Sequence, residues 1–310
     1  MKHLTKKHKD TIFVWSLLAF PICQWLIFWL YKNSSTLFLA FQDSYTGEFT
    51  LYNFEYFFKR WRIGWETGEG LKLAFENSLI DIIITNFYRT PLDIFFSYVL
   101  FKKFFGHSFF RGVFYLPVIF GEIATTIMQA YVLDATGPIV ILGSKIGIEM
   151  PFEAMQSGLL GNFRTARATF FIMRLFSVSG GTILLLTSAL NRIPTDLFDS
   201  AKIDGCGFFT EFLKIAFPLI WSTVGISWIM GFVGGWLIYN RVLLLTGGLY
   251  NTGNLGYYLM SQSINAVTTQ GGTANYNYPA AVGLCFTAIL CPTAIILRHF
   301  AYKWITPVEF

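Results

Sequence analysis

Six long apolar stretches, separated by more polar segments, dominate this sequence. Each is about 20 residues long, which is the length that an α-helix needs to cross a hydrocarbon core of about 30 Å. The pattern therefore predicts an all-α polytopic membrane protein, with six transmembrane helices in one membrane domain that covers residues 11–310. The predicted spans are residues 11–31, 79–101, 113–133, 168–190, 219–240 and 279–297.

Composition supports a protein that is surrounded by lipid. Only 13% of the residues are charged, against about 25% in soluble domains, and the mean hydropathy is +0.51. These values argue against a soluble enzyme, a disordered chain or a fibrous protein. The formal net charge of +5 is too spread out to indicate nucleic acid binding. The cysteines lack the spacing of a metal site, so no metal site is predicted.

The positions of lysine and arginine predict which side of the membrane each chain end occupies. The tail, residues 1–10, is rich in lysine and predicts a cytoplasmic N-terminus. The first span lacks a small-residue cleavage site at its end, so it is expected to remain as a membrane anchor. An even number of spans then returns the C-terminus to the cytoplasm.

The connector between the fourth and fifth spans, residues 191–218, has a pattern of its own. Pro194 suits the first turn of a helix, where its missing N–H breaks no hydrogen bond. Apolar and charged side chains then alternate until Gly205, which permits a sharp turn. A second helical stretch, residues 208–217, leads to Pro218 at the mouth of the fifth span. The pattern predicts a short amphipathic helix and a turn on the cytoplasmic surface, which either docks on a partner or lies on lipid headgroups.

The same connector resembles a motif of known transporters. The letters DSAKIDG, residues 199–205, are followed after nine residues by IAFP, residues 215–218. This resembles the cytoplasmic loop of binding-protein-dependent ABC importer permeases, which reads E-A-A, three residues, G, nine residues, I-x-L-P. The sequence departs from that pattern at Asp199, Ser200 and Phe217. The letters IP before this helix and IDG at its end are similar to the carbohydrate branch, which includes the maltose-transporter permeases.

The resemblance implies the fold of a type I ABC importer permease with a cytoplasmic coupling helix, in the plasma membrane of a bacterium. It implies a transmembrane subunit that moves oligosaccharides into the cell and is not itself an enzyme. The implied partners are a second homologous permease, two ATPase subunits and an extracytoplasmic solute-binding protein. The chain has no G-x-x-x-x-G-K-[ST] phosphate-binding motif. No cofactor is therefore expected on this chain, and ATP and Mg²⁺ are expected on the ATPase partners.

The resemblance also assigns roles within the connector. In the family, the short helix docks in a cleft of the ATPase subunit, and closure of the ATPases pushes on it. Leu197, Phe198 and Ala201 are expected to make packed contacts with that subunit. Asp199 is expected to be a polar anchor, and Gly205 to form the tight turn. The expected coupling residues are Pro194, Leu197, Phe198, Asp199, Ala201, Asp204, Gly205 and Pro218.

Polar residues inside the spans predict a path for substrate, because a charge within a span is costly and usually faces a cavity. Glu122 and Gln129 share one face of the third span, and Arg174, Ser177 and Gly181 share one face of the fourth. The fifth span carries an aromatic stripe whose rings would pack on the apolar faces of sugars. Arg174 ranks first and favours an acidic or hydroxyl-rich substrate. The predicted path residues are Glu122, Gln129, Arg174, Ser177, Phe232, Trp236 and Tyr239.

These residues also have purely structural interpretations. Glu122 and Arg174 would pair with each other or with helix ends, and the aromatic stripe would be ordinary helix packing. Asp81, Arg89 and Asp93 would form an internal network within the second span. A different class of function is an ion-coupled secondary transporter that relays protons through Asp81, Asp93 or Glu122. The ion-coupled transporter would not explain the motif in the connector, residues 199–218.

Overall fold

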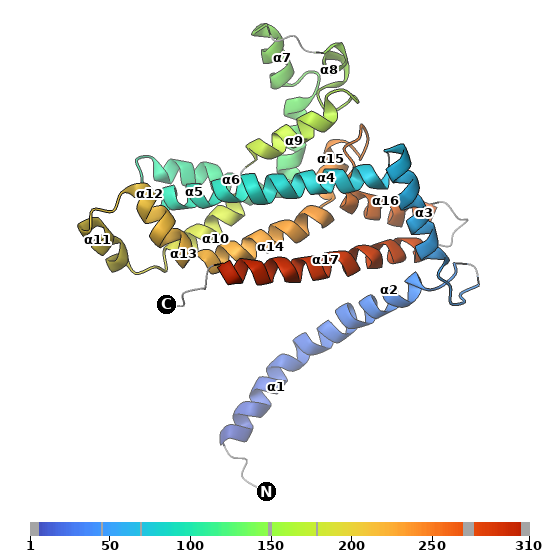
Figure 1. Cartoon of the computed structure of the whole chain (residues 1–310), viewed down its shortest axis with the longest axis horizontal. Helices are drawn as coiled ribbons and strands as arrows, with labels where there is room; N and C mark the ends of the chain where they lie inside the picture. Colours follow the sequence, from blue (N-terminus) through green and yellow to red (C-terminus); the bar gives the residue numbers. More distant parts are fainter. Residues whose placement is uncertain are drawn as a thin grey trace. The chain divides into compact units, whose positions relative to one another are not determined.

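The computed structural model describes residues 6–44, 46–68, 70–147, 151–177, 179–268 and 276–304. Within these ranges the chain forms helices joined by short connections, and the only β-pairing is an isolated bridge between Gln42 and Phe49 (Figure 1). The predicted all-α class is confirmed. The chain divides into two compact units. Unit 1 comprises the residues up to Arg62 together with Ser261–Ala288, and unit 2 comprises Ile63–Met260 together with the residues from Ile289 onward.

Unit 1 begins with one long apolar helix. α1 (Lys6–Trp25), η1 (Leu26–Tyr31) and α2 (Lys32–Ala40) follow one another with helical dihedral angles at each junction. Thr11–Ala40 is long and apolar enough to cross a membrane, and none of its most apolar window is buried within the protein. The helix continues past the predicted end at residue 31, because no glycine or proline interrupts the residues that follow.

Three helices contribute residues to both units. They are α3 (Tyr52–Thr67), α16 (Leu255–Thr268) and α17 (Asn277–Trp304). The last of these covers the sixth predicted span, and its apolar part is long enough to cross a membrane.

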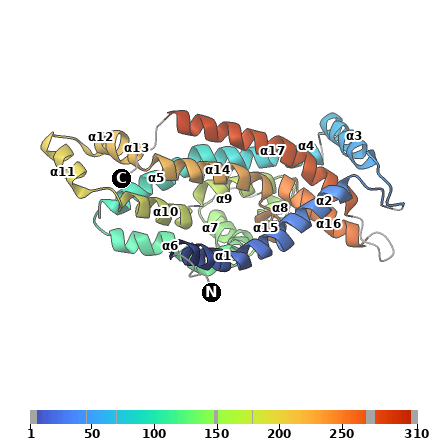
Figure 2. The ribbon, with the colours of Figure 1, turned by 90° about the horizontal axis from the view of Figure 1, so that it is seen from below.

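The longest helical run of unit 2 consists of α4 (Leu71–Ile83), η2 (Ile84–Arg89) and α5 (Thr90–Phe101), and it covers the second predicted span. α14 (Trp221–Leu237) lies alongside α4, and α10 (Gly180–Leu190) lies alongside α5 (Figures 1 and 2). A buried apolar cluster joins α5, α10 and the start of α14. Its members are Ile94, Tyr98, Leu186, Leu190, Ile193, Phe198, Ala216, Ile220 and Val224.

Two predicted spans are interrupted, so the expectation of continuous helices there is wrong. α6 (His107–Leu133) breaks at Gly121, whose φ of 76° and ψ of 162° lie in a region that glycine alone adopts readily. The fourth predicted span divides into α9 (Ala166–Phe176) and α10, with extended backbone at Ser177 and Ser179. Serines followed by two glycines favour such a break, because they have weak helix propensity and the Ser179 hydroxyl caps α10.

The fifth predicted span is preceded by a sharp bend. The helical residues Phe208–Leu219 and α14 meet at an angle of 75°. By length and composition, four helices in the described ranges are able to cross a membrane, or five if this bent pair is counted as one span. The second predicted span is not among these, and its helix carries Asp81, Arg89 and Asp93.

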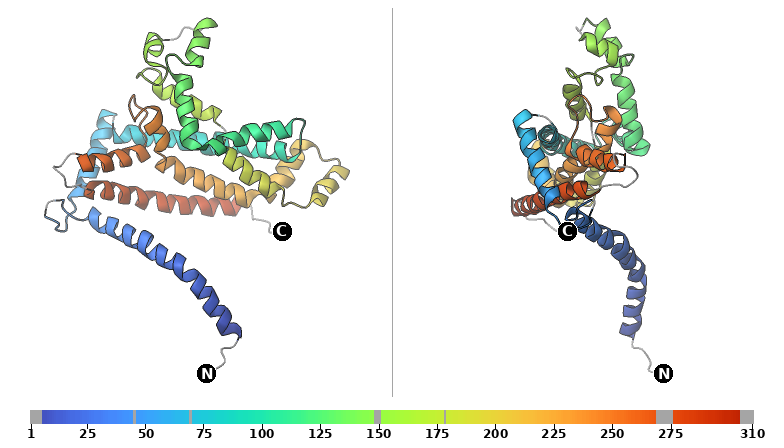
Figure 3. Two further views of the ribbon diagram at one scale, coloured as in Figure 1. Left: turned by 180° about the vertical axis from the view of Figure 1, so that it is seen from behind. Right: turned by 90° about the vertical axis from the view of Figure 1, so that its right-hand side faces the viewer.

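Two short helices project from the rest of unit 2. They are α7 (Pro138–Lys145) and α8 (Phe152–Ser157), which lie between α6 and α9 in the sequence (Figure 3). The connector forms α11 (Thr195–Ile203), which lies at the opposite end of α14 from α15 (Asn240–Leu245) (Figures 1 and 2).

Candidate functional site

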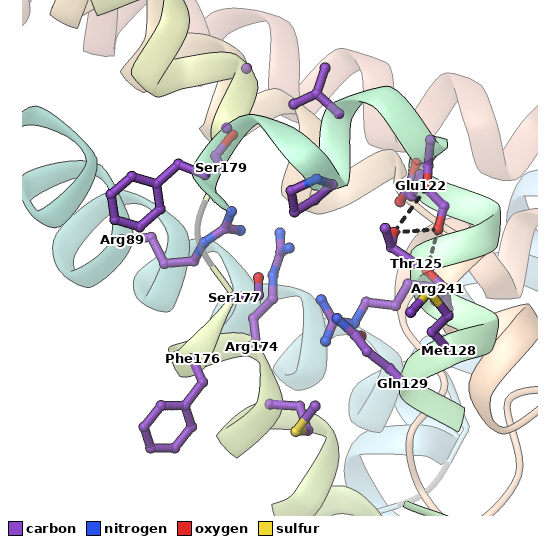
Figure 4. Close-up of a pocket in the computed structure, with 18 of the residues that line it drawn as sticks. Arg89, Glu122, Thr125, Met128, Gln129, Arg174, Phe176, Ser177, Ser179 and Arg241 are labelled. Atoms are coloured by element: carbon purple, nitrogen blue, oxygen red, sulfur yellow. Dashed lines mark hydrogen bonds between the residues drawn. The ribbon is translucent and has the colours of Figure 1, made fainter. Parts of the chain in front are cut away.

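A cavity of about 820 Å³ lies in unit 2 where α6, α9, α10 and α15 meet (Figure 4). Its volume is within the range of about 300–1,000 Å³ that is usual for ligand pockets. Four predicted path residues line it: Glu122 and Gln129 from α6, Arg174 from α9, and Ser177 from the break after α9. The structure therefore brings together the polar residues of the third and fourth predicted spans.

Arg174 forms a buried ion pair that ties α9 to the α4–η2 run. Its Nε donates to Asp81 Oδ1 at 2.7 Å, and one Nη donates to Asp81 Oδ2 at 3.3 Å and to Thr85 Oγ1 at 3.2 Å. The two side chains are only 14% and 12% exposed. The structural alternative in which Arg174 pairs with Glu122 is therefore wrong, because the Asp81 carboxylate binds the guanidinium at two points.

The break between α9 and α10 is stabilised by the second span. The backbone N–H of Ser179 donates to Asp93 Oδ1 at 3.3 Å. Gly180 lies so close to α6 that a Cβ there would be 2.1 Å from the Phe114 carbonyl oxygen.

The prediction that Arg174, Ser177 and Gly181 share one helical face is wrong, because this break separates them. All three nevertheless line the cavity.

Two further arginines line the cavity. Arg89 of η2 and Arg241 of α15 are each only 8% exposed, and Figure 4 shows both guanidinium groups directed into the cavity beside that of Arg174. The Arg241 guanidinium also lies 5.6 Å from the centre of the Phe170 ring. The sequence predicts Arg89 only as part of an internal network and does not predict a role for Arg241. Its position directly after the fifth predicted span is the only sequence feature that points to Arg241.

The aromatic residues of the predicted path lie elsewhere. Trp236 is 4% exposed, and its ring centre is 5.1 Å from that of Phe75 and 6.2 Å from that of Phe232. α14 ends at Leu237, so Tyr239 is not part of its stripe. None of the three predicted aromatic residues lines the cavity. For Trp236 and Phe232, helix packing is the role that the contacts support.

The connector has the predicted helix and turn. α11 follows directly after Pro194. Its C-terminus is a Schellman motif, in which the Cys206 N–H donates to the Ala201 carbonyl at 2.9 Å and the Gly205 N–H donates to the Lys202 carbonyl at 3.0 Å. Gly205 has the left-handed φ of 76° that this motif requires. The second stretch forms α12 (Phe208–Glu211), η3 (Phe212–Ala216) and α13 (Phe217–Leu219), and α13 contains Pro218.

The side chains that α11 exposes differ from those expected to contact the ATPase subunit. Phe198 and Ala201 are 4% and 7% exposed and are turned towards the protein's own helices, so they are not available for packed contact with a partner. Leu197 and Ile203 are 40% and 87% exposed, and Asp199 and Asp204 are exposed as well. Asp196, Ser200 and Lys202 are exposed on the same segment. We call the two apolar side chains, Leu197 and Ile203, together with Asp199 and Asp204 the outer face of α11.

One exposed pair lies on the same helix. Lys202 Nζ is 3.0 Å from Asp199 Oδ1. This hydrogen bond raises the pKa of the Lys202 ammonium above its ordinary value.

A buried polar network fastens α12 to α5, and its lysine lies over the Phe198 ring of α11. Glu211 is 4% exposed. It pairs with Lys102, and it accepts a hydrogen bond from the Tyr98 hydroxyl at 2.9 Å. The Lys102 ammonium also lies 4.8 Å from the centre of the Phe198 ring. The sequence did not predict this network, although Glu211 is an isolated carboxylate in an apolar stretch.

The sequence is similar to those of known transport permeases. No family model matches the chain. It is 24% identical over 263 residues to the multiple sugar-binding transport system permease protein MsmF of Streptococcus mutans, across 84% of this chain and 87% of that protein. It is 23% identical over 314 residues to the probable ABC transporter permease protein YesP of Bacillus subtilis, across 98% of this chain and 95% of that protein.

The fold also matches a solved transporter. A chain from the crystal structure of a bacterial alginate ABC transporter in complex with alginate pentasaccharide-bound periplasmic protein has a TM-score of 0.76 to this chain. The two are 17% identical, and the match covers 99% of each chain. The resemblance predicted from the connector is confirmed.

Proposed function

We propose that this chain, which is an ABC importer permease by its relatives and its fold, is the translocation subunit through which an importer moves oligosaccharides into the cell. The observation that carries the proposal is the geometry of α11. It is a capped helix whose inner face is anchored in the bundle, while its outer face is left exposed.

The proposed coupling runs from the outer face of α11 into the spans. Leu197, Ile203 and the two acidic residues would contact an ATPase subunit, which binds ATP and Mg²⁺. Phe198 and the Glu211 network would transmit its movement to α5. Since α5 continues through η2 to α4, this movement would reach Arg89 and Asp81 beside the cavity.

The remaining partners follow from the same proposal. The cavity would face a second, homologous permease, so that the translocation path lies between the two. An extracytoplasmic solute-binding protein would deliver the sugar. MsmF of Streptococcus mutans, a relative in sequence, is the permease protein of a multiple sugar-binding transport system. Both termini would lie in the cytoplasm, as the basic tail predicts.

The rival function, ion-coupled transport, receives less support from the site. One of its three candidate carboxylates is already engaged, because Asp81 pairs with Arg174. A proton relay needs carboxylates that gain and lose protons during the cycle. A carboxylate held by an arginine stays ionised.

Uptake by the assembled transporter in proteoliposomes tests the proposed function. We expect oligosaccharide uptake to require ATP on the side of the membrane that carries the ATPase subunits. Uptake should stop when vanadate is added. Dissipating the proton gradient should leave uptake unchanged. Uptake that continues without ATP and stops with a proton ionophore would contradict the proposal and support the secondary transporter.

A Gly205→Val variant is expected to lose ATP-driven uptake in the same assay. No atom of the described residues lies within 4 Å of the position that a Cβ would occupy, so the effect comes from the backbone. Holding an L-residue in the left-handed region costs about 1–2 kcal/mol, and this strain would unwind the end of α11. Gly205→Asn is the matched control, because asparagine tolerates that conformation. Equal uptake by the valine variant and the wild type would exclude the turn from coupling.

A further inference from the structure

We propose that the cavity binds the carboxylate groups of an acidic oligosaccharide, such as a chain of uronate sugars, through Arg89 and Arg241. This inference rests on the proposed function, since it specifies which sugars the permease accepts. It is carried by the charges that line the cavity and by the guanidinium nitrogens that the protein leaves without partners.

The lining of the cavity has an excess of positive charge. Among its ionisable side chains in the described part of the protein, three are arginines and one, Glu122, is a carboxylate. Arg174 is already neutralised by Asp81. Arg89 and Arg241 form no ion pair within 4.0 Å with any described residue. The net charge of the cavity lining is therefore positive.

Unpaired guanidinium nitrogens identify the two side chains that lack a partner within the described part of the protein. Arg89 Nε, Arg241 Nε and one Nη of Arg241 are buried and have no hydrogen-bond partner among the described residues. Leaving a buried donor unpaired costs about 1–3 kcal/mol, and more when the group is charged. A carboxylate accepts two parallel hydrogen bonds from one guanidinium and also neutralises it, whereas a sugar hydroxyl does only part of this. An acidic sugar is thus the substrate class whose carboxylates would pair with both guanidinium groups.

The rest of the lining fits a sugar chain better than a small inorganic anion. The cavity volume of about 820 Å³ exceeds what a phosphate or sulfate would fill. Gln129, Ser177 and Thr125 offer amide and hydroxyl groups to sugar hydroxyls, and Met128 and Phe176 offer apolar contact to C–H faces (Figure 4). Glu122 can accept hydrogen bonds from hydroxyls at the same site.

Binding of two matched probes to the assembled transporter in nanodiscs tests this proposal. The probes are trigalacturonate and its fully methyl-esterified form, which has the same ring skeleton without charge. We expect calorimetry to give an affinity for trigalacturonate about tenfold higher than for the ester. We also expect that advantage to shrink at high salt. Equal or tighter binding of the ester by the wild-type protein would overturn the proposal without any variant.

Variants then locate the charge recognition. Arg89→Gln and Arg241→Gln should each weaken trigalacturonate binding about tenfold while the ester affinity stays the same. Arg164→Gln is the matched control, because Arg164 is exposed and does not line the cavity. Thermal unfolding of each variant shows whether it is folded. Unchanged trigalacturonate binding in both folded cavity variants would place the anion elsewhere and contradict the proposal.

Two further results separate this inference from its rivals. If trigalacturonate binds in phosphatidylcholine nanodiscs and is displaced when phosphatidylglycerol is included, the arginines serve lipid headgroups and the inference is wrong. If neutral maltotriose undergoes ATP-driven uptake while trigalacturonate does not bind, the acidic substrate class is wrong but the proposed function stands. The absence of ATP-driven uptake for every sugar would instead count against the proposed function itself.

Discussion

Replacing Phe198 by alanine is expected to separate ATP hydrolysis from sugar uptake in the assembled transporter. The Phe198 ring is buried against Phe101, with ring centres 5.2 Å apart, and beneath the Lys102 ammonium. Truncating a buried phenylalanine lowers the free energy of unfolding by about 3–5 kcal/mol. An α11 without this anchor would still meet the ATPases through its outer face, but it would no longer move α5. Uptake and ATPase rates, measured together, check this result.

Ile203→Asp is the comparison that separates the two faces of α11. Ile203 is 87% exposed, so its replacement should change the free energy of unfolding by no more than about 0.5 kcal/mol. It should instead weaken co-purification of the ATPase subunits. The reverse pattern, in which Phe198→Ala loses the ATPases at unchanged stability, would show that Phe198 contacts the partner as the sequence first indicated.

Breaking the pair of Arg174 and Asp81 is expected to have a similarly large effect on stability. Arg174→Met leaves Asp81 as a buried charge without its partner, which costs about 3–5 kcal/mol. The double variant Arg174→Met/Asp81→Leu should recover most of that loss, because an apolar pair of similar volume replaces a buried ion pair without penalty. Sugar uptake should remain low in both variants, since the guanidinium is absent from the cavity. Unfolding in detergent and uptake in proteoliposomes measure the two effects.

An exposed pair provides the control for that double-mutant cycle. Lys202 and Asp199 on α11 are 61% and 64% exposed, and exposed pairs of this kind contribute little to stability. Lys202→Met should therefore leave unfolding unchanged. If Arg174→Met is equally harmless, the Arg174 pair is not the structural tie between α9 and α4 that its geometry indicates. Normal uptake by the double variant would remove Arg174 from the substrate path.

The sequence predicts those features that depend on neighbouring residues. The short helix of the connector and its turn depend on a proline, an alternating pattern and a glycine, all within a few residues of one another. Glu122, Gln129, Arg174 and Ser177 were also found, because a polar group in an apolar span requires a cavity or a partner. The sequence of one span does not reveal whether its polar side chain faces a cavity or pairs with another side chain.

Features that depend on distant parts of the chain were not predictable. The partner of Arg174 is Asp81, far away in the sequence, and only the packing of α9 on α4 brings them together. The inward orientation of Phe198 depends on α5, and the burial of Trp236 depends on Phe75. Periodicity also concealed the breaks at Gly121 and Ser177, because an apolar stretch reads the same whether its helix is continuous or interrupted.

Photo-cross-linking from the outer face of α11 tests the central claim most directly. A benzophenone-bearing residue in place of Ile203, in the assembled transporter, is expected to form a covalent adduct with an ATPase subunit. The same group in place of Phe163, which is 71% exposed on a different segment, should form no adduct with that subunit. Adducts from position 203 that contain only lipid, in a complex that hydrolyses ATP and takes up sugar, would contradict the account.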